Sequence, residues 1–246
     1  MTKINLAINA LKLFISRNLS QFKIKGTMQE NITRVSYLYS YNNENDNVKI
    51  SNILSETIGQ IHPVRLKKTD INEIEGIKIL SDMLKKNKFS QFEQQLLLGI
   101  IWFSEALSIY DHSEKYLPNE STNYKTDDFI FFKFSEMTTK LFTSLESILI
   151  VKEGEPIREN LSERIAILLQ DNYDERIKLK KKIKNLYDNR SKIIHSGDFF
   201  ISKNEFYELL GINRNVLIKL VKLNNKYEFK NMIDLETYFN KIKYDN

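Results

Sequence analysis

The residues most suggestive of chemistry are an arginine and a histidine in one predicted helix, Arg190 and His195. An imidazole can accept or donate a proton near neutral pH. A guanidinium can stabilise negative charge on a phosphate group through its planar set of donors. Together the two groups supply what cleavage of RNA by its own 2′-hydroxyl needs, without a metal ion.

Arg190 occupies a position where the helical pattern predicts an apolar side chain. It lies seven residues after Ile183, on the stripe that the helix is expected to bury. An arginine there is costly unless an acceptor meets it. We expect Glu146 to be that partner, because it lies between Phe142 and Leu149 on the apolar side of its own helix.

The same helix is strongly basic. Eight basic residues fall between positions 176 and 192, and they are Arg176, Lys178, Lys180, Lys181, Lys182, Lys184, Arg190 and Lys192. Such a field suits a phosphate backbone. The expected RNA contacts are Lys180, Lys181, Lys182, Lys184 and Lys192. Two plainer interpretations stay open: the lysines form a solvated helix face, and His195 complements the helix dipole at a C-terminal cap.

Several other chemistries are excluded by composition. The chain has no cysteine, so thiolate zinc sites, iron–sulfur clusters and thiol catalysis are excluded. His62, His112 and His195 are far apart and fit no local metal spacing. The chain has no phosphate-binding glycine loop and no G-x-S-x-G or H-E-x-x-H motif. We expect neither a metal nor a cofactor.

The elements that position these residues are mostly helical. Only 7 Gly and 3 Pro occur in 246 residues, which favours long helices over many tight turns. Apolar periodicity predicts a helical bundle in the C-terminal two-thirds of the chain, residues 76–246. The predicted helices cover residues 77–84, 90–110, 127–148, 160–169, 174–196, 203–223 and a segment after Asp234.

Three local signals are expected to mark helix ends. Asn160 with Glu163, and Ser202 with Glu205, have the spacing of capping boxes. Gly197 is expected to be the left-handed residue that ends the basic helix.

Residues 1–75 are an N-terminal extension, helical or mixed α/β. Ile4, Ile8, Leu11 and Ile15 predict a first amphipathic helix. Residues 32–41 fit either a helix or a strand that pairs, across the polar run 42–47, with residues 48–54.

No stretch of the sequence is suited to crossing a membrane. The longest nearly unbroken apolar run is Leu96 to Phe103, far below the roughly 18–20 residues that are needed. Asn5, Asn9 and Lys12 interrupt the N-terminus, so a signal peptide is not expected. These observations predict a cytoplasmic protein without a membrane partner.

The segment Leu186 to His195, LYDNRSKIIH, resembles the signature of the HEPN domain family, most closely its ApeA-like branch. Three further segments match that branch in order: IIWFSEAL, LFTSLESIL and LSERIAILL. The resemblance covers residues 77 to 200. It implies a helical bundle that dimerises with two Arg-x4-6-His motifs face to face, and a metal-independent RNA endonuclease.

Arg190 and His195 match the catalytic pair of that family, and Ser191 matches the polar position after the arginine. Glu146 matches the acidic residue of the LE segment, and Tyr187 and Asn189 belong to the same signature. The family often acts as a toxin or in phage defence by abortive infection, which implies a possible antitoxin or sensor partner. Some members are catalytically silent binding modules, and that alternative stays open.

Overall fold

The computed structural model describes the backbone of residues 6, 7, 9, 13, 37–42, 47–52, 65–67, 76–113, 128–196, 201 and 203–244. Side chains are described for residues 6, 7, 9, 13, 76–107, 135–192, 201 and 205–244. The described elements are, in chain order, β1 (Tyr37–Asn42), β2 (Asn47–Asn52), β3 (Arg65–Lys67), α3 (Ile77–Leu84), α4 (Gln91–Ser113), α5 (Asp128–Leu149), α6 (Ile157–Leu169), α7 (Tyr173–Ser196), α8 (Lys203–Tyr227) and α9 (Met232–Tyr244).

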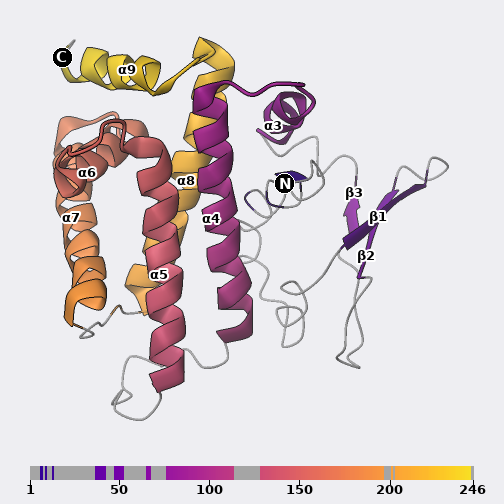
Figure 1. Cartoon of the computed structure of the whole chain (residues 1–246), viewed down its shortest axis with the longest axis horizontal. Helices are drawn as coiled ribbons and strands as arrows, with labels where there is room; N and C mark the ends of the chain where they lie inside the picture. The colour runs from indigo at the N-terminus through magenta and orange to yellow at the C-terminus, as the bar shows by residue number, and fades with distance from the viewer. Residues whose placement is uncertain are drawn as a thin grey trace.

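The helices form a bundle around one apolar core, so the predicted mostly α fold is confirmed. Figure 1 shows α4 and α5 side by side, α8 behind them, and α9 across one end of the bundle. The apolar stripe of α4 is buried, with Phe92, Leu96, Ile100 and Phe103 each at most 1% exposed. Burial of such stripes supplies most of the stability of helices in a protein of this size.

Helices α4 and α5 approach each other closely at Gly99. An added Cβ at this position would lie 3.1 Å from the carbonyl oxygen of Ser144 and 3.2 Å from Leu217 Cδ2. The Ser144 hydroxyl donates a hydrogen bond to the Gly99 carbonyl at 2.7 Å, and the Asn213 amide donates to the Leu141 carbonyl at 2.6 Å. Ser144 and Asn213 are fully buried, so these bonds join α4, α5 and α8 inside the core.

The first residues of the chain pack against this bundle. Leu6 and Leu13 belong to its core, and the Ser104 hydroxyl donates to Asn9 Oδ1 at 2.8 Å. Arg214 of α8 donates through Nε to the Leu13 carbonyl at 3.0 Å. The predicted stripe Ile4, Ile8, Leu11 and Ile15 lies outside the described residues.

Between the N-terminus and the bundle the chain forms a small antiparallel sheet. Its strand order is β1-β2-β3, and the β1–β2 register runs from Tyr37 opposite Asn52 to Asn42 opposite Asn47. Of the two interpretations of this stretch, the strand pair is the one observed, and the helical alternative is wrong for residues 37–42. The β3 pairing was not predicted, because three residues are too short for a periodic signal.

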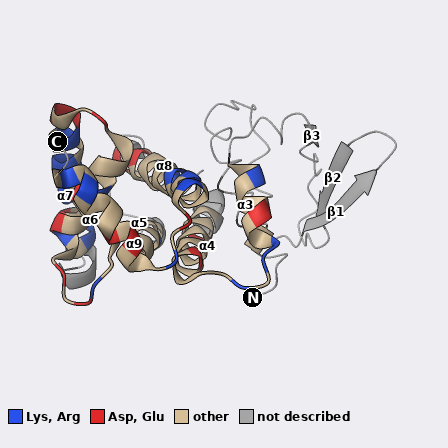
Figure 2. Ribbon diagram, turned by 90° about the horizontal axis from the view of Figure 1, so that it is seen from above, with Lys and Arg blue, Asp and Glu red and all other residues tan. Residues whose placement is uncertain are grey.

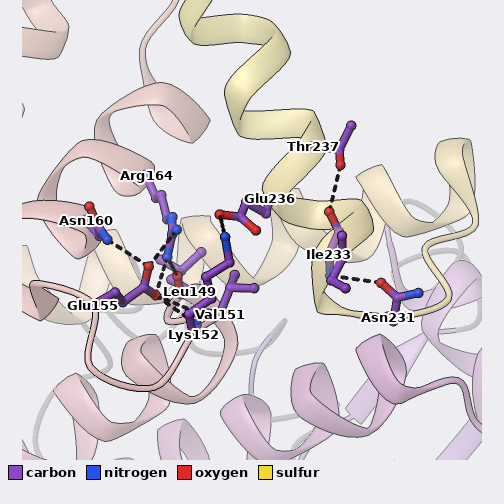
Figure 3. Close-up of polar contacts among 10 residues, drawn as sticks. All are labelled: Leu149, Val151, Lys152, Glu155, Asn160, Arg164, Asn231, Ile233, Glu236 and Thr237. Atoms are coloured by element: carbon purple, nitrogen blue, oxygen red, sulfur yellow. Dashed lines mark hydrogen bonds and ion pairs between the residues drawn. The ribbon is translucent and has the colours of Figure 1, made fainter.

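Helix ends differ from the sequence prediction in two places. The Asn160–Glu163 capping box is wrong: α6 begins at Ile157 after Pro156, and the Asn160 amide donates to Glu155 instead (Figure 3). Helix α9 begins at Met232 rather than after Asp234, because Asn231 Oδ1 accepts the backbone N–H of Ile233 at 2.8 Å.

One capping box was not predicted from the sequence, and two predicted helix-end signals fall on residues that the structure does not describe. At the start of α4, Ser90 Oγ accepts the Glu93 N–H at 3.2 Å, and Glu93 Oε2 accepts the Ser90 N–H at 2.9 Å. Gly197 and Ser202 lie outside the described residues.

Candidate functional site

The motif residues Arg190 and His195 both lie on α7. The helix begins after Asn172, whose side-chain oxygen accepts the N–H groups of Asp174 and Glu175 at 2.8 and 3.3 Å. Helix α7 continues to Ser196, so its backbone places His195 in the last turn, while the His195 side chain lies outside the described residues.

The guanidinium of Arg190 lies in a mostly buried position against α5. Its Nη2 is 3.6 Å from Glu146 Oε1, and the two side chains are 20% and 21% exposed. The predicted pairing of these two residues is therefore confirmed. The pair is loose, because 3.6 Å exceeds a hydrogen-bond distance. Within the described part of the chain, both Arg190 Nε and Glu146 Oε1 are buried without a hydrogen-bond partner.

The ring of Tyr187 contacts the same guanidinium. The Arg190 Cζ lies 5.4 Å from the centre of the Tyr187 ring, within the range of a cation–π contact. The ring also packs edge-on against Phe142 of α5, with centroids 5.3 Å apart. Burial, and then the negative charge of Glu146, raise the pKa of the Tyr187 hydroxyl. Tyr187 is therefore a neutral platform for Arg190 at physiological pH.

Three of the lysines predicted to bind RNA form ion pairs with carboxylates of neighbouring helices. Lys180 pairs with Glu163 of α6 at 3.2 Å, Lys184 with Glu159 of α6, and Lys182 with Glu208 of α8. Figure 2 shows acidic and basic residues mixed on the ribbons of α6 and α7. Lys181 and Lys192 are exposed. The sequence could not indicate these pairs, since the acidic residues are distant along the chain.

A second arginine contacts α7 near the motif. Arg158, the second residue of α6, donates from Nε and Nη2 to the two carboxylate oxygens of Asp188 at 2.6 and 2.7 Å. This fork holds the pKa of Asp188 below its usual value. Arg158 could not be identified from the sequence, because an arginine at a polar helix position is indistinguishable from a solvated one.

The remaining predicted residues flank this arrangement. Asn189 and Ser191 are partly exposed on α7, on either side of Arg190. Among the described residues, no group of three His, Asp or Glu side chains is placed to hold a metal ion. In the same part of the chain, no helix is long and apolar enough to cross a membrane.

The comparisons with known proteins give no match: no family model, no curated protein and no solved structure is significantly similar to this chain. The protein is thus defined by its fold class, a mostly α helical bundle with a small antiparallel sheet, and by the Arg190 site.

Proposed function

We propose that this protein is a metal-independent RNA endonuclease of the HEPN type, with Arg190 and His195 as its catalytic residues. The observation that supports the proposal best is the state of Arg190. Its guanidinium is mostly buried, loosely paired with Glu146, and retains a buried Nε that has no acceptor among the described residues. A phosphate oxygen is the kind of acceptor that such a group binds well.

The reaction is a transesterification within the RNA strand. A base removes the proton of the 2′-hydroxyl, the 2′-oxygen attacks the adjacent phosphorus, and the bond to the 5′-oxygen breaks as that oxygen takes a proton. Arg190 stabilises the charge on the pentavalent phosphorane. The products carry a 2′,3′-cyclic phosphate, or after its hydrolysis a 3′-phosphate, and a 5′-hydroxyl.

The proposed active form is a homodimer. One chain offers a single imidazole in the motif, whereas the reaction is best served by a base and an acid on opposite sides of the phosphate. His195 takes one role and His195 of the partner subunit takes the other. The biological setting that the resemblance favours is a cytoplasmic toxin or phage-defence effector, controlled by an antitoxin or a sensor protein.

A catalytically silent HEPN module that binds RNA or a protein partner is the second candidate. The ion pairs of α7 favour its protein-binding form, because Glu163, Glu159 and Glu208 offset the charge of Lys180, Lys184 and Lys182. A surface neutralised in this way attracts a phosphate backbone less than the sequence suggests.

Cleavage of RNA in excess EDTA separates the two candidates. The nuclease proposal predicts that the purified protein cuts a mixed-sequence RNA in EDTA and that His195→Ala loses at least about a hundredfold in rate, the usual range for a general acid or base. His112→Ala is the matched control and should keep the activity. Equal cleavage by wild type and His195→Ala would leave only the binding module.

A further inference from the structure

The ties between α6 and α7 form a ladder that ends beside the motif. Because the two helices run antiparallel, Glu163 meets Lys180, then Glu159 meets Lys184, and finally Arg158 meets Asp188. Helix α6 begins at Ile157, only one residue before Arg158, while α7 continues to Ser196. The Arg158–Asp188 contact thus lies where α7 passes the end of α6.

This last contact differs in kind from the others in the ladder. Two nitrogens of Arg158 donate to both oxygens of Asp188. In contrast, Lys180 contacts Glu163 through a single nitrogen, and Lys184 contacts Glu159 in the same way. A planar fork fixes the orientation of its partner as well as its distance. Arg158 Nη1 also contacts Glu159 at 3.1 Å, which holds the guanidinium from the side of α6.

The opposite side of the same α7 turn is tied to α5. Tyr187 packs against Phe142, and Arg190 faces Glu146 at 3.6 Å. Residues 187 to 190 are therefore held from two directions, by apolar and ionic contacts to α5 and by the fork to α6. The contact from Arg190 is the loose one, so it does not by itself fix the helix.

We propose that Arg158 is a positioning residue of the proposed RNase site: its fork on Asp188 orients the last two turns of α7, which carry Arg190 and His195. The inference rests on the proposed function for its catalytic consequence. Arg158 acts through Asp188 and the α7 backbone.

Amide hydrogen exchange of residues 189–196, measured with RNA cleavage, tests this role in the full-length protein. Arg158→Gln removes the fork, and Arg158→Lys keeps the charge without the fork. We expect both variants to exchange about fivefold faster in 189–196 than wild type. We expect kcat to fall about tenfold, because small misplacements of catalytic groups are costly, while KM stays within about twofold.

Glu163→Gln is the matched control, since it removes the single-point tie to Lys180 between the same two helices, together with a contact to Lys243 of α9. It should leave exchange in 189–196 and kcat within about twofold of wild type, because a partly exposed ion pair contributes little unless it is bidentate, as the Arg158 fork is and this tie is not. Unchanged exchange in both Arg158 variants would overturn the proposal, and so would faster exchange with an unchanged kcat. If wild type cuts no RNA, the proposed function fails, and the exchange data alone still decide whether Arg158 orients the end of α7.

Discussion

Two arginines of the bundle differ in how closely they pair with a glutamate. Arg164 of α6 is fully engaged: it donates to both oxygens of Glu155 at 2.7 and 2.9 Å and to the Leu149 carbonyl, and both side chains are 9% exposed (Figure 3). Arg190 is 3.6 Å from Glu146 and keeps a buried Nε without a partner in the described part of the chain. The first arrangement is a structural clasp for the turn between α5 and α6. The second leaves one buried donor, Nε, unsatisfied by the described residues.

The Arg164–Glu155 clasp should be sensitive to acid. Burial acts to raise the pKa of Glu155, but hydrogen bonds from Arg164 and the Val151 N–H outweigh it and hold the pKa below its usual 4.5. A carboxyl with a lowered folded-state pKa stabilises the fold above its unfolded pKa and loses that contribution as pH falls. Glu155→Gln should therefore cost about 3 kcal/mol of unfolding free energy at pH 7.

Urea unfolding of wild type and Glu155→Gln at pH 7 and at about pH 3 measures this effect. The difference between the two proteins should shrink at the lower pH, because Glu155 takes up a proton in the unfolded wild-type chain there, while its lowered pKa opposes that uptake in the folded protein. Asp82→Asn is the control for an exposed pair with Lys85, and it should change stability little at either pH. An equal difference at both pH values would contradict the account.

At the scale of helices, apolar periodicity predicted most of the bundle and little of its ends. The stripes of α4, α5 and α7 could be predicted because burial of one face imposes a 3.6-residue period. The start of α6 could not, because Asn160 had a better partner in Glu155 than in its own helix backbone. Whether a side chain caps a helix depends on the neighbours that it meets in the folded protein. A short sequence motif carries no information about those neighbours.

Two glycines on different helices offer a paired test of helix contact. An added Cβ at Gly99 would lie 3.1 Å from the backbone oxygen of Ser144, whereas at Gly211 it meets no described atom within 4 Å. Alanine is favoured over glycine in a helix by about 1 kcal/mol, so Gly211→Ala should stabilise the protein by about that amount. Gly99→Ala should destabilise it, because α5 must move away from α4 and the Ser144 bond to Gly99 lengthens.

Thermal unfolding of the two alanine variants gives the comparison. The expected result is a higher midpoint than wild type for Gly211→Ala and a lower one for Gly99→Ala. A gain of stability in both variants would show that the α4–α5 contact yields without cost.

At the scale of the whole molecule, ion pairs between helices offset part of the positive charge of α7. The basic run of α7 indicated a phosphate-binding face, with a solvated helix face as the alternative. The bundle instead sets carboxylates of α6 and α8 against three of its lysines. The Arg190–Glu146 pair could be predicted, because both residues interrupt apolar stripes. The Arg158–Asp188 fork could not, because both residues occupy polar positions and only the packing of α6 on α7 brings them together.

The chemistry of the RNA ends tests the central claim most directly. A short RNA is incubated in EDTA with wild type, with Arg190→Lys and with His195→Ala, and the product masses are measured. Wild type should form 2′,3′-cyclic phosphate and 5′-hydroxyl ends. Arg190→Lys should form the same ends more slowly because the planar fork is lost, and His195→Ala should form none. Intact RNA after incubation with the wild-type protein, or products with 5′-phosphate ends, would contradict it.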